Sequence, residues 1–373
     1  MRIVADDAIP GAAELFGPLG DLALASGRSL TASDLRNADA LIVRSVTRVD
    51  ARLLEGAHVR FVGSATSGTD HVDLEYLQSR NIRFADAAGC NAQAVAEYVL
   101  TAIFLDARRR RVDPRGQTIG IVGCGRIGSK VERLLARLGI RTLKNDPPLA
   151  DAGMMSDSIT LEALLPACDV VTLHVPLTGH GPHPTRDLLS ASRIRALKPG
   201  ATIINASRGE ILDDAALYSA LREARARAVL DVWRNEPAID ARLVELASFA
   251  TPHLAGYTVE ARRQATRLVA RQLATWSGRH PNPPEFPEKT PSVTIEALAD
   301  STAADVLARI CPLEAIDDSV RTAAASGTLT RDFDAIRARY AARREWSSVH
   351  VVHHDTLPPG TAAALDALGI AHA

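Results

Sequence analysis

Gly123-Cys124-Gly125-Arg126-Ile127-Gly128 is the stretch that decides the fold of this 373-residue chain. The apolar run Gln117–Val122 precedes it and reads as a strand. A helical pattern follows, with Val131, Leu135 and Leu138 on one side. The order strand, glycine turn, helix is the dinucleotide-binding turn of a doubly wound α/β fold, and this context makes the glycine spacing informative.

Each glycine of this turn has a separate physical reason. Gly123 permits the tight turn, and Gly125 lets backbone amides approach a pyrophosphate with no side chain in between. Gly128 lets the helix pack close to the strand. The helix N-terminus would then face the diphosphate with unpaired amides and a partial positive charge.

The next strand, Arg141–Asn145, ends at Asp146, 18 residues after Gly128. A carboxylate at this place accepts hydrogen bonds from the adenosine ribose hydroxyls and repels the 2′-phosphate of NADP. The sequence therefore predicts NAD as the cofactor. The alternative is an ordinary strand–turn–helix in which Asp146 is only a turn residue before two prolines.

Strands alternate with helical stretches on both sides of the glycine turn. Before it, the expected strands are Arg2–Ala5, Ala40–Val43, Arg60–Gly63 and Ile82–Phe84, and a long helix should span 92–107. After it, the expected strands are Asp169–Val175, Thr202–Asn205 and Val229–Trp233. This alternation predicts an α/β protein with two doubly wound parallel sheets. The arginines at 108–111 read as the solvated end of the long helix.

The last part of the chain is separated by a proline-rich segment. Five prolines within 281–291 disfavour helix, so we expect an extended linker there. Beyond it we expect a smaller unit with a helix over Phe333–Arg344 and a strand over Ser348–Val352.

Composition argues against several classes of partner. The formal net charge of −1 gives no broad basic surface for nucleic acid. No apolar run approaches the roughly 18 residues that a membrane helix needs. The four cysteines have no paired spacing, which predicts reduced thiols in a cytoplasmic protein. The histidine pairs at 180/183 and 353/354 lack a carboxylate or thiolate at matched spacing, so no metal is expected.

Three residues at or just after predicted strand ends form a set that suits oxidation of a 2-hydroxy acid. His253 could take the hydroxyl proton, because its ordinary pKa of about 6.5 lets it act both ways near neutrality. Glu236 could hold and stabilise the imidazolium, and Arg208 could grip the substrate carboxylate. Singly, they could equally be a buried histidine, a turn residue and a surface arginine, but their joint occurrence after the cofactor turn favours catalysis.

The segments around Arg208, Glu236 and His253 resemble the signatures of the D-isomer-specific 2-hydroxyacid dehydrogenase family over nearly all of residues 1–280. The resemblance implies an NAD-dependent oxidoreductase with a flavodoxin-like catalytic domain into which a Rossmann cofactor domain is inserted. The implied parts are 1–92 with 257–280 (catalytic), 93–256 (NAD-binding), 281–291 (linker) and 292–373 (a small α+β dimerisation domain).

Further segments resemble one branch of the family, whose substrate is a phosphorylated 2-hydroxy acid and which forms homodimers through its C-terminal domain. They are Ser64–Asp73, Gly89–Asn91 before Glu97-Tyr98, Gly181–Thr185, Tyr257 and Arg343–Ser348. Two positions depart from the pattern: Asp187 stands where a histidine is expected, and Val175 where a threonine is expected.

The resemblance also implies which residues line the site. On the substrate side these are Arg44, Ser45, Thr66 and Tyr257. On the cofactor side these are Gly123, Gly125, Arg126, Ile127, Gly128, Asp146, Val175, Ala206, Arg208, Asp231 and Gly256. The catalytic set is Arg208, Glu236 and His253.

Three other interpretations stay open at the level of sequence. The chain could be another dehydrogenase of the family, for instance one acting on 3-phosphoglycerate. It could be a non-enzymatic, corepressor-like protein that senses NAD, although such a protein need not keep the three catalytic residues together. The C-terminal part could bind a small regulatory molecule instead of forming a dimer.

Overall fold

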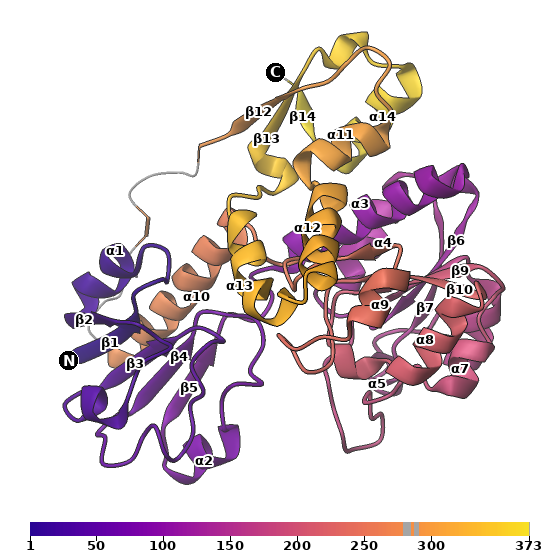
Figure 1. The fold of residues 1–373 in the computed structure, drawn as a ribbon. Helices are drawn as coiled ribbons and strands as arrows, with labels where there is room; N and C mark the ends of the chain where they lie inside the picture. The colour runs from indigo at the N-terminus through magenta and orange to yellow at the C-terminus, as the bar shows by residue number, and fades with distance from the viewer. Residues whose placement is uncertain (279–284, 287–290, 373) are drawn as a thin grey trace. The chain divides into compact units, whose positions relative to one another are not determined.

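The computed structural model describes residues 1–278, 285–286 and 291–372, so most of the predicted linker 281–291 lies outside the described residues. The chain divides into two compact units. The first consists of Met1–Asn91 with Val259–Pro291, and the second of Ala92–Thr258 with Ser292–Ala373 (Figure 1). The fold class predicted from the sequence is confirmed: two doubly wound parallel sheets are present, followed by a small α+β part.

The first unit is built on a five-stranded parallel sheet in the order β2-β1-β3-β4-β5, which is the flavodoxin-like order. Its strands are β1 (Arg2–Asp6), β2 (Asp21–Ala25), β3 (Ala40–Val43), β4 (Phe61–Ser64) and β5 (Arg83–Asp86). Its helices are α1 (Ala12–Phe16), α2 (Leu74–Ser79) and α10 (Val259–Ser277). Sequence analysis missed β2, because this edge strand is only partly buried along its length.

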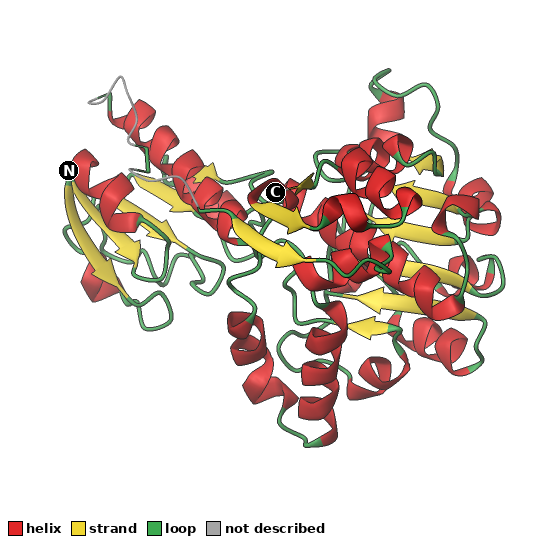
Figure 2. Ribbon diagram, turned by 90° about the horizontal axis from the view of Figure 1, so that it is seen from above, coloured by secondary structure: helices red, strands yellow, loops and turns green. Residues whose placement is uncertain are grey.

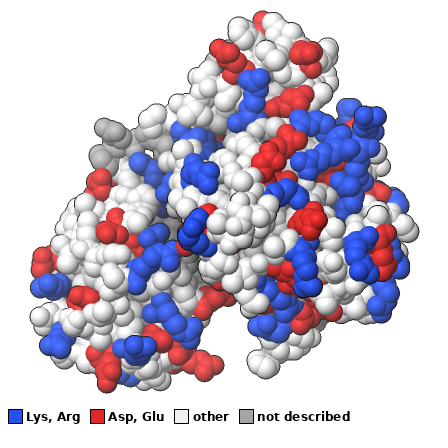
Figure 3. Space-filling model, viewed as in Figure 1, with Lys and Arg blue, Asp and Glu red and all other residues white. Residues whose placement is uncertain are grey.

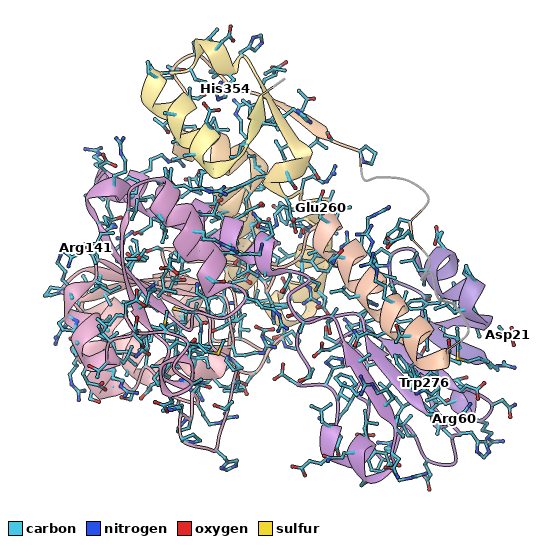
Figure 4. All side chains as sticks on the ribbon, turned by 180° about the vertical axis from the view of Figure 1, so that it is seen from behind. Asp21, Arg60, Arg141, Glu260, Trp276 and His354 are labelled. Carbon is cyan, nitrogen blue, oxygen red and sulfur yellow. The ribbon has the colours of Figure 1, made fainter. Side chains whose placement is uncertain are left out.

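Helix α10 returns from far along the chain to cover this sheet. Its buried stripe includes Val269 and Leu273, and a Cβ added at Gly63 of β4 would lie 2.5 Å from a Val269 methyl. The missing side chain therefore lets the helix lie close to the strand. At the end of α10, Trp276 packs its ring on Phe61 and under the Arg60 guanidinium, 5.7 Å from the ring centroid (Figure 4).

The second unit contains a six-stranded parallel sheet in the order β11-β10-β9-β8-β6-β7. Its strands are β6 (Thr118–Val122), β7 (Arg141–Asn145), β8 (Val170–Leu173), β9 (Ala201–Asn205), β10 (Ala226–Leu230) and β11 (Phe249–Ala250). Its helices are α3 (Ala92–Arg110), α4 (Gly128–Arg137), α5 (Pro147–Asp151), α6 (Leu161–Leu164), α7 (Ala191–Arg195), α8 (Asp214–Arg222) and α9 (Ala241–Leu246). Strand order reverses at β6, between β7 and β8, which is where open α/β sheets place ligands. Figure 2 shows the strands of the sheets with helices packed around them.

The C-terminal residues form a three-stranded parallel sheet and four helices. The strands, in the order β12-β13-β14, are Val293–Glu296, Val349–Val352 and Ala371–His372. The helices are α11 (Ala303–Ile310), α12 (Leu313–Ala325), α13 (Leu329–Arg339) and α14 (Pro359–Leu368). The helix predicted over Phe333–Arg344 therefore lies four to five residues earlier, because residues after Tyr340 turn away to meet α3 and the loop after β11.

This C-terminal part packs against the larger sheet unit through α3. Leu307 of α11 and Trp346 share one apolar core with Tyr98 and Phe104 of α3. Arg108, at the end of α3, forms ion pairs with Asp305 and Glu314. The expectation of a fully solvated arginine end is therefore wrong for this residue, since its partners lie about 200 residues later in the chain.

The face drawn in Figure 3 has no single dominant sign of charge. Acidic and basic side chains lie intermixed across the face drawn in Figure 3. Among the described residues, no helix combines the length and the apolar character that crossing a bilayer requires.

Candidate active site

The parallel order of the larger sheet gathers the predicted catalytic residues at one edge. Arg208 follows β9, Glu236 follows β10 and His253 follows β11, and these three strands are neighbours. The glycine turn follows β6 and Asp146 follows β7 in the same sheet. Because all six strands run the same way, their carboxyl ends share this edge.

His253 and Glu236 form a close pair at this edge. The His253 Nδ1 lies 2.7 Å from the Glu236 Oε2, and the side chains are 39% and 24% exposed. The other carboxylate oxygen, Oε1, accepts a hydrogen bond from the Trp233 amide at 2.9 Å, which fixes the carboxylate. With Nδ1 held in this way, the second ring nitrogen of His253 is left to meet a substrate.

The electrostatics of the pair favour the protonated imidazole. Burial lowers the His253 pKa, but the Glu236 charge and hydrogen bond outweigh it and hold the pKa above its usual value of 6.5. The Arg208 guanidinium acts in the opposite direction on the same pKa. The three predicted catalytic side chains therefore interact electrostatically within one site.

Arg208 is positioned by its own backbone surroundings. Its carbonyl accepts a hydrogen bond from the Asn205 side chain at 2.9 Å, and its Nη1 donates to the Ser207 carbonyl at 2.7 Å. The next residue, Gly209, runs so close to Trp233 that a Cβ there would lie 2.0 Å from the Trp233 carbonyl carbon. This contact ties the Arg208 turn to the loop that carries Glu236.

Asp231 is buried at the end of β10 and holds the loop that carries His253. Its carboxylate accepts hydrogen bonds from the Leu254 amide (2.8 Å), the Ala255 amide (2.9 Å) and the Thr251 hydroxyl (2.6 Å). Its backbone carbonyl accepts from the His253 amide at 2.7 Å. The sequence predicts Asp231 on the cofactor side, and that role stays a prediction. The support that Asp231 gives to the His253 loop was not predicted from the sequence.

The geometry of the glycine turn fits a bound dinucleotide. Gly123 has a φ of 88°, and a Cβ at Gly128 would lie 2.0 Å from the Gly123 carbonyl oxygen. At the exposed Gly125, a Cβ would meet nothing within 4 Å, so the space before the helix is open. No side chain in the described part of the chain caps α4, whose N-cap residue is Ile127. The Ser129 and Lys130 amides bond to the Gly125 and Ile127 carbonyls, so a diphosphate would meet the amides that precede them at this helix start.

Asp146 has a structural task as well as the predicted one. One carboxylate oxygen accepts from the Cys124 amide at 2.7 Å, and the other caps α5 through the Leu149 amide at 3.0 Å. A carboxylate offers about four lone-pair sites, so these bonds leave capacity for ribose hydroxyls. The turn-residue interpretation and the cofactor interpretation are thus compatible in this geometry.

His174, directly after β8, lies beside the glycine turn and was not among the residues predicted from the sequence. A Cβ at Gly123 would lie 2.8 Å from the backbone of His174 and 2.9 Å from a Val175 methyl. Burial lowers the pKa of His174 to about 3, so its ring is neutral, and its Nε2 lies 3.0 Å from the Thr172 hydroxyl. In the sequence, the position of His174 directly after a predicted strand was the only feature that could have pointed to it. Ala206 and Gly256, also predicted here, are half-buried after β9 and β11.

The predicted substrate residues divide between the two units. Arg44 and Ser45 follow β3 and Thr66 follows β4, at the carboxyl ends of neighbouring strands of the first unit. The Arg44 Nε donates to the buried Asp6 at 3.0 Å, which orients the guanidinium. Tyr257 belongs to the second unit, where the Arg337 guanidinium lies 5.7 Å from its ring centroid.

Comparisons with known proteins bear directly on these residues. Residues 91–255 match the model of the D-isomer specific 2-hydroxyacid dehydrogenase, NAD binding domain. An erythronate-4-phosphate dehydrogenase from Chromohalobacter salexigens is 44% identical over 94% of this chain and 94% of its own length. One from Edwardsiella ictaluri is 43% identical over 99% of this chain and 98% of its own length.

The chain belongs to the erythronate-4-phosphate dehydrogenase family. Members of this family are oxidoreductases of the D-isomer specific 2-hydroxyacid dehydrogenase group, and the cofactor of the matched domain is NAD. The family resemblance found in the sequence is thereby confirmed. The corepressor-like interpretation loses its support, since the chain is an enzyme.

Solved structures agree with this family at the level of the fold. A Thermus thermophilus protein superposes with a TM-score of 0.63 and 30% identity, over 77% of this chain and 100% of its own. An Entamoeba histolytica 3-phosphoglycerate dehydrogenase gives a TM-score of 0.64 over 76% of this chain and 98% of its own, at 24% identity. The latter likeness concerns the fold alone and gives no support to 3-phosphoglycerate as the substrate.

Proposed function

We propose that this enzyme oxidises 4-phospho-D-erythronate to (R)-3-hydroxy-2-oxo-4-phosphooxybutanoate with NAD, as a step in vitamin B6 synthesis. The observation that carries the proposal is the His253–Glu236 pair at 2.7 Å, at the sheet edge that also bears Arg208 and the glycine turn. The substrate follows from the relatives, which bear that activity in their names and match nearly the whole chain.

In this proposal His253 is the general base. Its second ring nitrogen takes the proton of the C2 hydroxyl, while Glu236 at Nδ1 stabilises the imidazolium that forms. NAD, when bound, accepts the hydride that leaves C2. One proton and one hydride leave the substrate, so the alcohol at C2 becomes a ketone and both atoms and electrons are accounted for.

Arg208 binds the substrate carboxylate and polarises the oxygen at C2. Its guanidinium is planar and always charged, which matches a carboxylate in two parallel hydrogen bonds. Its backbone carbonyl and Nη1 are both engaged locally, which limits its freedom before substrate arrives. No group of three metal-binding side chains occurs among the described residues, and Arg208 supplies the positive charge that this chemistry needs.

Arg44 and Ser45 are assigned to binding of the anionic substrate, and Thr66 and Tyr257 are assigned to the substrate side as well. A phosphate carries up to about two negative charges near neutrality. Each charge-assisted hydrogen bond contributes about 1.5–3 kcal/mol, so two are enough to select a phosphorylated acid. We expect Arg44→Ala to raise the Michaelis constant for the phosphorylated acid; an unchanged constant rejects the assignment.

Three further proposals concern oligomeric assembly, cofactor choice and cellular location. The C-terminal part, 292–373, is proposed to form a homodimer, to be checked by the mass of the intact protein in solution. Asp146 is proposed to select NAD over NADP, and equal or tighter NADPH binding would overturn this role. The enzyme is also proposed to be cytoplasmic, a compartment in which cysteines such as its four stay reduced.

The decisive experiment follows NADH absorbance with the purified protein, NAD and 4-phospho-D-erythronate. A parallel reaction contains an added 2-oxo acid, which shows whether bound NADH is reoxidised in place. Initial rates with 3-phosphoglycerate provide the comparison. A higher kcat/KM for 3-phosphoglycerate would replace the proposed substrate, and no reduction with either acid would reject it.

A further inference from the structure

The loop after β11 has two buried carbonyls. That of Leu254 accepts a hydrogen bond from the Tyr257 amide at 2.8 Å within the loop, and both carbonyls also bond to a group outside it. Leu254 and Ala255 follow His253 directly, and each is only 1% exposed. Their amides are already bonded to the Asp231 carboxylate. A buried carbonyl without a donor is costly, so the partner of these oxygens is informative.

The donor from outside the loop is the same for both carbonyls, a single arginine of the C-terminal part. The Arg343 Nη2 donates to the Leu254 carbonyl at 3.0 Å and also to the Ala255 carbonyl. These contacts join residues 88–89 positions apart in the chain. The Leu254–Ala255 segment is therefore held from both sides, by a carboxylate at its amides and by a guanidinium at its carbonyls.

Arg343 is itself fixed in place. The residue is 7% exposed, and its Nη1 contacts the Cys311 sulfur at 3.3 Å. Burial lowers the pKa of Arg343, but the contact with Cys311 and, to a lesser degree, the carboxyl groups of Glu97 and Asp231 outweigh it, so the pKa lies above its usual value. Burial raises the pKa of Glu97 itself to about 8.

Two further bonds fasten the same C-terminal segment. The Trp346 amide donates to the Glu97 Oε2 of α3 at 3.0 Å. The Thr258 hydroxyl, at the far end of the loop, donates to the Glu345 Oε1 at 3.2 Å. Residues 343–346 thus bond to the loop at two places and also to α3, the helix that packs on the larger sheet.

We propose that Arg343 is a positioning residue that holds the His253 loop in its reactive conformation, so that the C-terminal part serves turnover within the same chain. The proposal rests on the proposed function in one respect, namely that His253 is the base. Arg343 acts through the loop backbone and is not itself assigned to the substrate or the cofactor. This role is separate from the dimerisation predicted for the C-terminal part.

Geometry explains why this support matters for rate. His253 is placed by the backbone, because its amide and the two following amides all end on Asp231. A misplacement of about 1 Å at a reacting group lowers the rate about 10²-fold. A guanidinium fork can hold two carbonyls at a fixed angle, whereas a lysine ammonium is a single point on a flexible stem.

The test compares wild type with Arg343→Lys, which keeps the buried charge but loses the fork. Arg343→Gln is the second variant, for use if the lysine variant does not fold, and Arg339→Lys in the exposed end of α13 is the matched control. We expect kcat to fall about tenfold or more, by the positioning argument, with the KM and the NADH dissociation constant within about threefold. The control should match wild type.

Hydrogen exchange provides a readout that does not depend on activity. In the Arg343 variant, amides in 250–258 should exchange faster, while those of the glycine turn at 123–128 should not change. A folded variant with wild-type kcat, or with unchanged exchange in 250–258, would overturn the proposal. A parallel loss of NADH affinity would also overturn it, since that indicates general disruption. If wild type oxidises no acid, the proposed function fails, and hydrogen exchange alone decides whether Arg343 holds the loop.

Discussion

The turn after β6 and the loop after β11 sit at the same edge of one sheet, but they are held in different ways. The glycine turn is shaped by its own backbone: Gly123 adopts a φ of 88°, and Gly128 comes so close to Gly123 that no side chain fits. The His253 loop is shaped by buried side chains from other segments, with Asp231 at its amides and Arg343 at its carbonyls.

This difference separates local from distant control of a site. A turn fixed by missing side chains is encoded mainly in one short motif, although Asp146 and His174 from later segments also contact this one. A loop fixed by buried charges depends on groups that must be brought together and desolvated as a set. The predicted cofactor turn is therefore encoded mainly by a short motif, and the proposed proton-transfer site depends on the whole second unit.

The largest expected effect is on the proton-transfer side. His253→Ala removes the proposed base, and turnover should fall by about 10²–10⁴, the usual contribution of a positioned acid–base group. NADH affinity should stay close to that of wild type, because the glycine turn is built separately. Steady-state rates measure turnover, and fluorescence titration with NADH measures cofactor affinity. Turnover near the wild-type level would remove His253 from its role.

Glu236→Gln should have the next largest effect, and it also carries a pH signature. Turnover should fall by roughly tenfold to a hundredfold, less than for loss of the base itself. Glu236 raises the His253 pKa, and oxidation requires the neutral ring, so activity appears only as pH rises through that pKa. Without the carboxylate the pKa falls, and the acid limb of kcat/KM should move to lower pH. A limb that stays in place or moves upward contradicts the pairing.

Two alanine variants test the cofactor side from opposite directions. In Gly128→Ala the new Cβ would lie 2.0 Å from the Gly123 oxygen, so stability should fall by about 1–3 kcal/mol, as in overpacked sites. In Gly125→Ala the Cβ meets nothing within 4 Å, so the melting temperature should not change. The NADH affinity of Gly125→Ala should nevertheless fall about tenfold, equivalent to about 1.4 kcal/mol. Unchanged affinity would mean that the diphosphate does not lie there.

The smallest expected effect concerns an outer support of the His253 loop. The Tyr98 hydroxyl lies 2.7 Å from that of Thr251, which in turn donates to Asp231. Tyr98→Phe removes one buried hydrogen bond, so the free energy of unfolding should fall by about 0.5–1.5 kcal/mol. Turnover should stay within about twofold, since the Asp231 and Arg343 contacts remain. A large loss of turnover with unchanged stability would show that the support of the loop extends into α3.

Sequence patterns predicted the two parallel sheets because continuous apolar runs such as Ala40–Val43 mark strands buried on both faces. The same rule missed β2, an edge strand that is only partly buried. It also placed the helix α13 too far along the chain, since Arg343 looks like helix continuation until its buried partners are known. The paired state of Arg108 was equally invisible, because Asp305 and Glu314 have no local relation to it.

Taken by itself, the sequence determined the fold class, the cofactor turn and the set of Arg208, Glu236 and His253, because these depend on short-range periodicity, glycine geometry and residue chemistry. The tertiary structure alone decided that His253 meets Glu236 at 2.7 Å and that Arg343 reaches the loop beside His253. Such contacts form only when distant segments lose water together and pair their buried charges, and no local pattern records which groups will do so.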